Sequence, residues 1–243
     1  MKLDTQRLIL REVEATDVDA MFAWQVDLRY LEHYPVERTS RQDTLDLVGR
    51  FIGWKLERPR WRWQLAITLP ISGELIGSCG VRRAEPDSPS ADIGYELNPD
   101  HWGHDYATEA VGRNVAFVFD EVGLDELTAR TVVTNSRSIR VLERLGFSHS
   151  LSIPPGTGKD GRDWPQRSEY RLPREDWSPC YRSPPPLLCP HRVFICTASR
   201  INLAQGAERM QADSLADAES SQIEPVGRRW QQPACFWAPG FRL

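Results

Sequence analysis

Residues 94–110 read GYELNPDHWGHDYATEA, and this stretch decides how the centre of the chain folds. Apolar and polar residues alternate over positions 91–97, which is the pattern of a half-buried strand. Tyr95 and Leu97 would lie on one face of this strand and Glu96 on the other. Turn residues and then helix-forming residues follow, so the sequence predicts a strand, an open turn and a helix in succession.

The turn after this strand leaves backbone N–H groups open. We expect a helix from about residue 107 to residue 119, and the N–H groups of Gly103 to Thr108 have no acceptor within it. Such groups and the positive end of the helix dipole together make a site for an anion. Gly103 and Ala107 would let an anion approach closely, since neither carries a bulky side chain. From the turn alone, an ordinary strand-to-helix connection is the simpler interpretation.

Strand and helix patterns flank this central unit on both sides. Capping signals at Thr16–Asp19 and Ser40–Asp43 precede apolar residues at helical spacing. Strands on both sides of a strand–turn–helix unit predict an α+β fold, in which helices cover a mixed sheet. The expected strands lie near residues 8–13, 61–67, 74–82, 91–97, 127–133 and 167–172, with another from Phe147, and the expected helices lie near residues 16–24, 40–56, 107–119 and 136–145.

Composition and charge restrict the classes of function. The 243 residues carry a net charge of −4 and no run of Lys and Arg, so we do not expect a nucleic-acid partner. Asp4 stands where a signal peptide would need apolar residues, and no apolar stretch reaches the roughly 20 residues of a membrane span. We therefore expect a cytoplasmic protein without a membrane partner.

Cysteines do not indicate a disulfide framework or a metal centre. Their number is five, which is odd, and Cys79 lies in an apolar strand-like run. Cys180, Cys189, His191 and Cys196 are conceivable ligands, but no C-x-x-C pair occurs among them. We expect no metal site.

The composition changes after Trp177. Eight of the 18 prolines lie within residues 178–243, and no periodic segment there exceeds a few residues. We expect a domain at residues 1–177 and a Pro-rich C-terminal tail at 178–243 that is poorly ordered or loosely docked.

Two segments together carry a family resemblance. GYELNPDHWGxxYATEA at 94–110 and TNSRSIRVLERLGF at 134–147 resemble the GNAT superfamily of acetyl-CoA-dependent acyltransferases, and most of all its branch of ribosomal-protein N-terminal acetyltransferases. TQRLILRE at 5–12 and EYRL at 169–172 also fit, so the resemblance covers about residues 1–177. It implies a GNAT-like mixed, mostly antiparallel sheet flanked by helices.

The resemblance also implies a place for acetyl-CoA. In the family, backbone N–H groups of the turn before the third helix bind the diphosphate of this cosubstrate. Asn135 resembles the family asparagine that hydrogen-bonds the pantetheine arm, although it could equally be a turn residue. The implied diphosphate-binding positions are Trp102, Gly103, His104, Asp105, Tyr106, Ala107 and Thr108.

Two residues of this turn depart from the family pattern. Asp105 replaces a glycine, and His104 stands where Arg or Lys is common. A carboxylate at a helix N-terminus is favoured by about 0.3–1 kcal/mol, but it repels a diphosphate. Asp tolerates a positive φ better than most residues. We expect Asp105 to weaken acetyl-CoA binding without abolishing it, unless its side chain turns to solvent. A protonated His104 could offset the repulsion, and a solvated turn residue is the simpler interpretation.

The resemblance assigns roles in the chemistry as well. The backbone N–H of Leu97 could polarise the thioester carbonyl, and Glu96 is the candidate general base, directly or through a water. Ser138 could orient or protonate the sulfur, because Leu142 takes the position of the family's tyrosine acid. The alternatives are a solvated strand residue for Glu96 and a first-turn helix residue for Ser138. Glu109 is expected to interact with the helix dipole instead of taking part in catalysis.

The most consistent function is an N-acetyltransferase. It would move the acetyl group of acetyl-CoA to a primary amine, either a protein N-terminus or a small amine, by direct attack. The alternative is a CoA-binding or protein-interaction module whose catalysis is reduced or lost because of Asp105. The loops at 29–40 and 151–166 are expected to line the acceptor site, and the protein would be a monomer or a homodimer.

Overall fold

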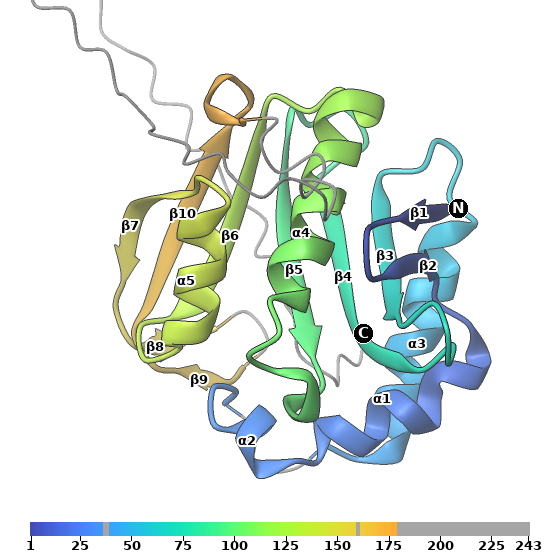
Figure 1. Cartoon of the computed structure of the whole chain (residues 1–243). Helices are drawn as coiled ribbons and strands as arrows, with labels where there is room; N and C mark the ends of the chain where they lie inside the picture. The colour runs from blue at the N-terminus through green and yellow to red at the C-terminus, as the bar shows by residue number, and fades with distance from the viewer. Residues whose placement is uncertain (36–38, 159–160, 179–243) are drawn as a thin grey trace, which may run out of the picture. The chain divides into compact units, whose positions relative to one another are not determined.

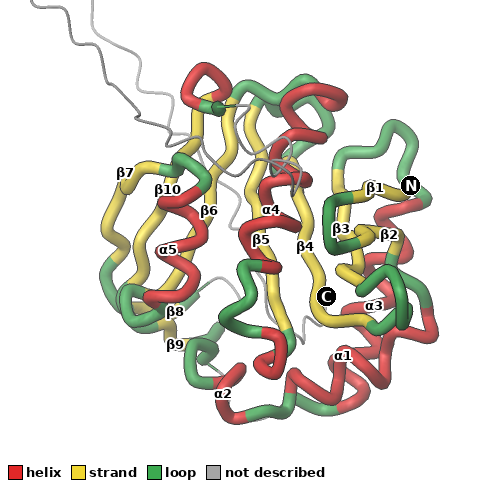
Figure 2. The backbone as a smooth tube through the Cα atoms, in the orientation of Figure 1, coloured by secondary structure: helices red, strands yellow, loops and turns green. Residues whose placement is uncertain are grey.

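The computed structural model describes residues 1–35, 39–158 and 161–178 (Figures 1 and 2). Beyond Ser178, the predicted tail lies outside the described residues and stays a prediction. The strands are β1 Lys2–Asp4, β2 Ile9–Glu12, β3 Arg62–Thr68, β4 Leu75–Arg83, β5 Ser90–Leu97, β6 Glu126–Val132, β7 Ser148–Ile153, β8 Gly156–Thr157, β9 Asp163–Trp164 and β10 Arg167–Pro173. The α-helices are α1 Val18–Gln25, α2 Leu28–Leu31, α3 Arg41–Lys55, α4 Tyr106–Phe117 and α5 Ser136–Arg144.

Eight strands form one sheet in the order β1-β2-β3-β4-β5-β6-β10-β7. Neighbouring strands are antiparallel except β5 and β6, which run parallel. These two pair only over Ser90–Asp92 and Glu126–Thr128. Beyond Asp92, the edge of β5 that faces β6 has no strand partner among the described residues. The predicted α+β class with a mixed, mostly antiparallel sheet flanked by helices is confirmed.

Helices cover both faces of this sheet. α4 and α5 lie in front of it in Figure 1, and α1 and α3 lie behind it. The apolar residues of α4 belong to a core cluster with β4 and β5, whereas α1 and α3 form a second cluster that includes Ala66 and Leu75. The alternation of side chains along each strand therefore supplies two cores, one on each face.

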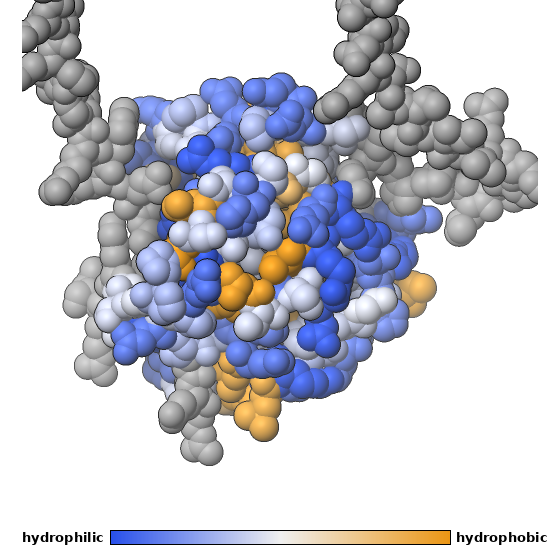
Figure 3. Space-filling view, turned by 90° about the vertical axis from the view of Figure 1, so that its left-hand side faces the viewer, coloured by the Kyte–Doolittle hydropathy of each residue, from blue (hydrophilic) through white to orange (hydrophobic). Residues whose placement is uncertain are grey.

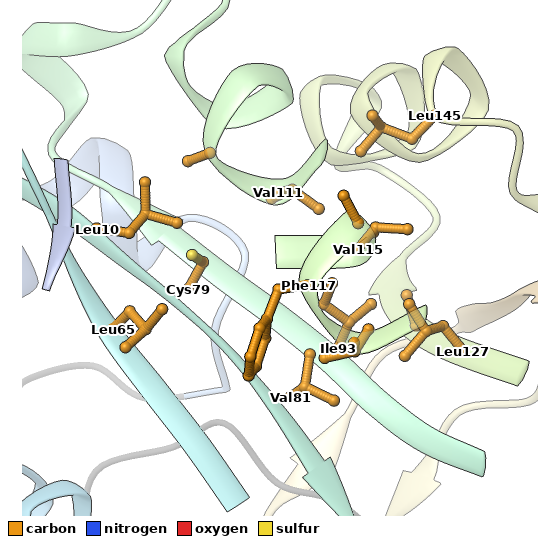
Figure 4. Close-up of a cluster of buried hydrophobic side chains, with 14 of the residues drawn as sticks. Leu10, Leu65, Cys79, Val81, Ile93, Val111, Val115, Phe117, Leu127 and Leu145 are labelled. Carbon is orange, nitrogen blue, oxygen red and sulfur yellow. The ribbon is translucent and has the colours of Figure 1, made fainter. Parts of the chain in front are cut away.

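The first core fixes where α4 begins. Val111 and Val115, one helical turn apart, pack with Val81 of β4 and Ile93 of β5 (Figure 4). All four side chains are buried. Full burial of each contributes about 1.5–3 kcal/mol, so α4 cannot slide along the sheet without a large loss. This packing holds the N-terminus of α4 close to the C-terminal end of β5.

Several predicted helix ends are confirmed. Ser40 and Asp43 form the expected capping box, with Ser40 Oγ accepting from the N–H of Asp43 at 3.1 Å and the Asp43 carboxylate accepting from the N–H of Ser40 at 3.0 Å. A π-helical turn continues α4 until Gly123, and Gly146 follows α5. Both glycines have φ in the left-handed region, at +77° and +89°.

The capping box expected at Thr16–Asp19 is wrong. A 3-10 turn precedes α1, and Asp17 accepts instead from the N–H of Glu14 at 2.8 Å. Its carboxylate also pairs with Arg11 of β2 at 2.7 Å. Glu14 and Asp17 form the capping box instead, so the chain turns two residues earlier than the sequence pattern indicated, and the ion pair with Arg11 holds Asp17 there.

Several short elements were not predicted from the sequence. β1, α2 and the β8–β9 hairpin have two to four residues each, which is too few for a periodic pattern. The hairpin lies within residues 151–166, which were expected to be a loop. No helix in the described part of the chain has the length and apolar character that a bilayer crossing requires.

The sheet ends at β7, whose outer edge is polar. This strand reads Ser-His-Ser-Leu-Ser-Ile, and Leu151 is its exposed large apolar residue. On the side of the molecule where β7 lies, Figure 3 shows apolar groups among a largely hydrophilic surface. A polar edge of this kind discourages pairing with another strand.

Gly80 of β4 makes room for a buried side chain. It lies opposite Gly94 of β5, and a Cβ at residue 80 would overlap with the side chain of Gln64 and the carbonyl oxygen of Trp63. Gln64 crosses this space and donates from Nε2 to Ser78 Oγ at 2.9 Å. A glycine is therefore needed here for close approach.

We predict that Gly80→Ala lowers the free energy of unfolding by about 1–3 kcal/mol, because the added methyl group overpacks the sheet. The matched control is Gly49→Ala in α3, where a Cβ would meet no atom within 4 Å. That change should raise the free energy of unfolding by about 0.5–1 kcal/mol, as expected for Ala in place of a helical Gly. Urea denaturation measures both. Equal effects of the two substitutions would contradict the packing assigned to Gly80.

Candidate functional site

A compact turn closes the C-terminal end of β5. Asn98 begins it, and its side-chain oxygen accepts from the N–H of Asp100 at 3.1 Å. The indole Nε1 of Trp102 donates back to the carbonyl of Leu97 at 3.0 Å. These contacts return the chain toward the strand it has just left, so the next residues lie beside the end of β5.

Two residues of the turn have left-handed backbone conformations. Gly103 has φ of +82° and Asp105 has φ of +60°. Glycine adopts this region at no steric cost, and Asp is among the few other residues that tolerate it. The positive φ therefore explains why an aspartate can occupy position 105, directly before α4.

The backbone N–H groups at the start of α4 have no acceptors. Within the described chain, none of the N–H groups of residues 103–108 donates to a protein atom, and the first bond into the helix runs from Glu109 N to Asp105 O at 3.0 Å. A set of free donors at the positive end of a helix favours an anion. The open turn predicted from the sequence is present.

A further N–H group opens at the end of β5. Asn98 donates its N–H to Ile76 of β4 at 2.8 Å. Successive N–H groups of a strand point to opposite edges, so the N–H of Leu97 points to the edge that faces β6. Because β6 pairs with that edge only as far as Asp92, the N–H of Leu97 has no strand partner there.

These groups border a cavity of about 270 Å³ between β5, α4 and α5. His104 is the one predicted residue that does not line it. Its ring stacks on the ring of Tyr106, with 5.6 Å between the two centroids. The predicted residues that line the cavity are Glu96, Leu97, Trp102, Gly103, Asp105, Tyr106, Ala107, Thr108, Asn135 and Ser138.

The carboxylate of Asp105 is drawn away from the helix start. It forms an ion pair with Arg144 of α5, which lowers the pKa of Asp105 through the charged hydrogen bond. It does not cap α4. The expected repulsion of an anion is therefore opposed by a guanidinium that the sequence analysis did not assign to Asp105.

Glu96 is buried and held by neutral donors. It is 4 % exposed and accepts from Tyr30 Oη at 2.6 Å, Ser78 Oγ at 2.9 Å and Gln25 Nε2 at 3.3 Å. Burial raises the pKa of Glu96, and the hydrogen bonds to its charged form lower it in part. The alternative of a solvated strand residue is wrong, whereas its position on the opposite face from Tyr95 is confirmed.

Ser138 has an aromatic hydroxyl as its neighbour. Tyr95 Oη lies 2.9 Å from Ser138 Oγ, and burial raises the pKa of Tyr95. Asn135 caps α5, because its side-chain oxygen accepts from the N–H of Ser138 at 3.0 Å. This is the contact expected of a turn residue before a helix. Leu142 is buried in the core and offers no proton. Tyr95 is therefore the phenol that lies next to Ser138.

Sequence reasoning missed several residues of this cavity. Tyr30 and Tyr34 stack at 4.7 Å and line it from the segment around α2. Arg137, Arg140 and Arg144 line it from α5. Their spacing of three and four residues places them on one helix face, and this periodicity was available in the sequence. The tyrosines lie within the loop 29–40 that was expected to line the acceptor site, but nothing in the local sequence singled them out.

A second cavity of about 120 Å³ shares five lining residues with the first, namely His33, Tyr34, Tyr95, Asn135 and Ser138. It is lined from both loops predicted to surround an acceptor, by His33 and Tyr34 of one and Trp164 of the other. The two cavities therefore meet where β5 and β6 diverge.

The described residues contain no group of three or more His, Cys, Asp or Glu side chains placed to hold a metal ion. Cys79 is buried, and burial raises its pKa to about 12. The other candidate ligands considered from the sequence, Cys180, Cys189, His191 and Cys196, lie outside the described residues.

Comparisons with known proteins identify the family of this chain. The family model of the acetyltransferase (GNAT) domain matches residues 7–148. The uncharacterized N-acetyltransferase YoaA of Bacillus subtilis (strain 168) is 31% identical over 146 residues, which cover 60% of this chain and 81% of that protein.

Solved structures share the fold. A GNAT-family acetyltransferase from Bacillus anthracis superimposes with a TM-score of 0.62 at 21% identity, over 72% of this chain and 99% of that one. RimJ of Mycobacterium smegmatis, solved in complex with CoA-disulfide, gives a TM-score of 0.58 at 23% identity, over 69% and 82% of the two chains.

Burial of Glu96 predicts a pH dependence of stability. Its folded pKa is raised above its ordinary value of 4.5, so the folded state holds the proton more tightly than the unfolded state. The stabilisation is fully present below the unfolded pKa and is lost as pH rises through the folded pKa. Glu96→Gln removes this dependence. The free energy of unfolding of the wild type minus that of the variant should therefore fall as pH rises above 4.5.

Urea denaturation at several pH values below and above 4.5 measures the difference in the free energy of unfolding between the wild type and Glu96→Gln. Glu169→Gln is the matched control, because Glu169 is equally buried but is paired with Arg130. A wild-type to Glu96→Gln difference that stays constant or grows with pH would show that the Glu96 pKa is not raised.

Proposed function

The chain belongs to the GNAT acetyltransferase family and is an acetyl-CoA-dependent acyltransferase, and from this premise we propose that it acetylates a primary amine by direct attack on the thioester. The acceptor is a protein N-terminus or a small amine. The observation that carries this proposal is the row of free N–H groups at residues 103–108 beside the open edge of β5. It offers donors to an anion and to a carbonyl at adjacent places.

The free N–H groups would bind the diphosphate of acetyl-CoA. Such donors contribute most to affinity where the backbone is already in position, because binding then costs little conformational entropy. Trp102 holds the turn against β5 through its bond to Leu97, and Asn135 offers its amide nitrogen to the pantetheine arm while its oxygen caps α5.

The N–H of Leu97 would polarise the thioester carbonyl. Negative charge develops on this oxygen when the amine attacks, and a fixed N–H at an edge without a strand partner can donate to it. Removal of a comparable donor in other enzymes costs about 10²–10³-fold in rate.

Glu96 would take the proton of the attacking amine, directly or through a water. A carboxylate with a raised pKa is a stronger base than an ordinary one. As the C–N bond forms, the nitrogen loses its proton to Glu96, and the C–S bond then breaks. Tyr30, Ser78 and Gln25 hold the carboxylate in place.

The leaving thiolate would receive a proton from Ser138, and the serine would recover this proton from solvent water. Its hydroxyl is hydrogen-bonded to Tyr95, which remains a neutral donor because burial raises its pKa. The pair supplies the function that Leu142 cannot perform.

The alternative of a module without turnover rested on the negative charge of Asp105. Arg144 pairs with that charge, which offsets part of the repulsion that Asp105 exerts on the diphosphate. We therefore favour a working enzyme. We also propose that the acceptor enters through the second cavity, and that the protein is a cytoplasmic monomer or homodimer that needs no metal.

Titration calorimetry with acetyl-CoA and a thiol-release assay over a panel of peptides and small amines test this function. We expect binding and thiol release with at least one amine. Glu96→Gln should bind acetyl-CoA as the wild type does but lose about 10²–10⁴-fold in kcat, because the base is absent.

Glu12→Gln, which removes a buried carboxylate outside both cavities, should keep the wild-type kcat. Binding without thiol release from any amine would support the module instead. Absence of binding would contradict both functions.

Neutralising Asp105 should strengthen binding of acetyl-CoA. Asn also tolerates the left-handed backbone, so Asp105→Asn removes one negative charge beside the diphosphate site and leaves the turn intact. We expect the Kd to fall about two- to fivefold at low salt, and less at high salt.

The double variant Asp105→Asn/Arg144→Gln loses both charges and should return close to the wild-type Kd. Weaker binding by the single Asp105→Asn variant would show that the ion pair itself is needed for the site.

A further inference from the structure

The motif Thr5-Gln6-Arg7-Leu8 has no part in the mechanism above, yet it contacts the start of α4. It forms the turn between β1 and β2, in which the N–H of Leu8 bonds to Thr5 Oγ1 at 2.9 Å. From this turn, Thr5 Oγ1 donates to Glu109 Oε1 at 2.6 Å. The backbone N–H of Arg7 donates to the same oxygen at 2.8 Å.

Arg7 reaches further than this anchor. Its Nε donates to Glu109 Oε2 at 2.7 Å, and its Nη1 donates to the carbonyl oxygen of His104 at 3.0 Å. The guanidinium also lies 4.8 Å from the ring centroid of Tyr106. One side chain from the N-terminal turn therefore contacts three residues of the segment 104–109.

Besides Arg7, the ion pair between Asp105 and Arg144 holds this segment. The N–H groups of residues 103–108 make no bond to protein, and the two left-handed residues flank His104 on both sides. The carbonyl of His104 lies between those two residues, and the bond from Arg7 restrains it there. Glu109 fixes the other end of the segment within the first turn of α4. Arg7 thus spans the turn from its middle to the helix.

The charge of Arg7 is already balanced. Glu109 neutralises it at 2.7 Å, and the Glu109 side chain is only 12% exposed. The main contribution of Arg7 is therefore geometric: it fixes donors before a ligand arrives, which reduces the ordering that binding requires.

We propose that Arg7 is a positioning residue for the diphosphate-binding turn, acting through Glu109 and the carbonyl of His104. This inference rests on the proposed function, because it assumes that residues 103–108 bind the diphosphate of acetyl-CoA. Glu109 accordingly has an anchoring role in addition to its favourable place near the helix dipole.

Two acyl donors distinguish positioning of the turn from general support of the fold. Acetyl-CoA carries the diphosphate, and S-acetylpantetheine carries the same thioester without it. For Arg7→Gln we expect the KM for acetyl-CoA to rise about tenfold with little change in kcat. The KM for S-acetylpantetheine should stay at the wild-type value, since that donor does not use the turn.

Two further variants separate geometry from charge. Arg7→Lys keeps the charge, but one ammonium group cannot reproduce the forked contact with Glu109 and His104, so most of the rise in KM should remain. Thr5→Val removes one neutral bond to Glu109 and should give a smaller rise in the same direction. These two variants carry the test if Arg7→Gln fails to fold.

Arg41→Gln is the matched control. Arg41 is also an exposed arginine in an ion pair, with Asp19, and it lies on α3 away from the turn. Its KM values for both donors should equal those of the wild type.

Several results would overturn the inference. Arg7 variants with an unchanged KM for acetyl-CoA, or with the same rise for both donors, would show that Arg7 does not act on the turn. A wild type that binds no acetyl-CoA would overturn the proposed function and this inference with it. If the wild type binds acetyl-CoA but the Arg7 variants keep the wild-type KM for it, only this inference is overturned and the proposed function stands.

Discussion

The site depends on backbone hydrogen bonds that the fold leaves unmade in two adjacent places. β6 pairs with β5 only as far as Asp92, which leaves the N–H of Leu97 at an open strand edge. The start of α4 leaves the N–H groups of residues 103–108 without acceptors. Buried backbone donors are costly without partners, so such groups persist where a ligand or solvent can reach them. The cavity between β5, α4 and α5 provides that access.

The pKa values of two carboxylates of the site are shifted in opposite directions. Glu96 is buried among hydroxyl and amide donors, and burial raises its pKa. Asp105 is exposed and paired with Arg144, which lowers its pKa. A raised pKa suits a proton acceptor, whereas a paired carboxylate with a lowered pKa suits a structural contact. The environments therefore separate the two roles more clearly than residue type does.

Residues that are distant in the sequence hold the turn in place. Arg7 and Glu109 are separated by 102 residues, and Asp105 and Arg144 by 39 residues. The core contacts of Val111 and Val115 set the position of α4 on the sheet, and these polar contacts then fix its first turn from both sides. These contacts stabilise the left-handed backbone conformation of Asp105, which would otherwise be unfavourable for a residue other than glycine.

Sequence periodicity by itself determined the strands, the long helices, the α+β class and the open turn, since these follow from side-chain alternation and from donors that a helix start cannot pair. It also placed Glu96 and Leu97 on opposite faces of β5. Only the tertiary structure decided that Asp17 pairs with Arg11 instead of capping α1, that Glu96 is buried instead of solvated, and that Arg144 faces Asp105. The reason is physical: a pattern along the chain reports which face a residue occupies, but the energy of a charge depends on partners that only folding brings within a few ångströms.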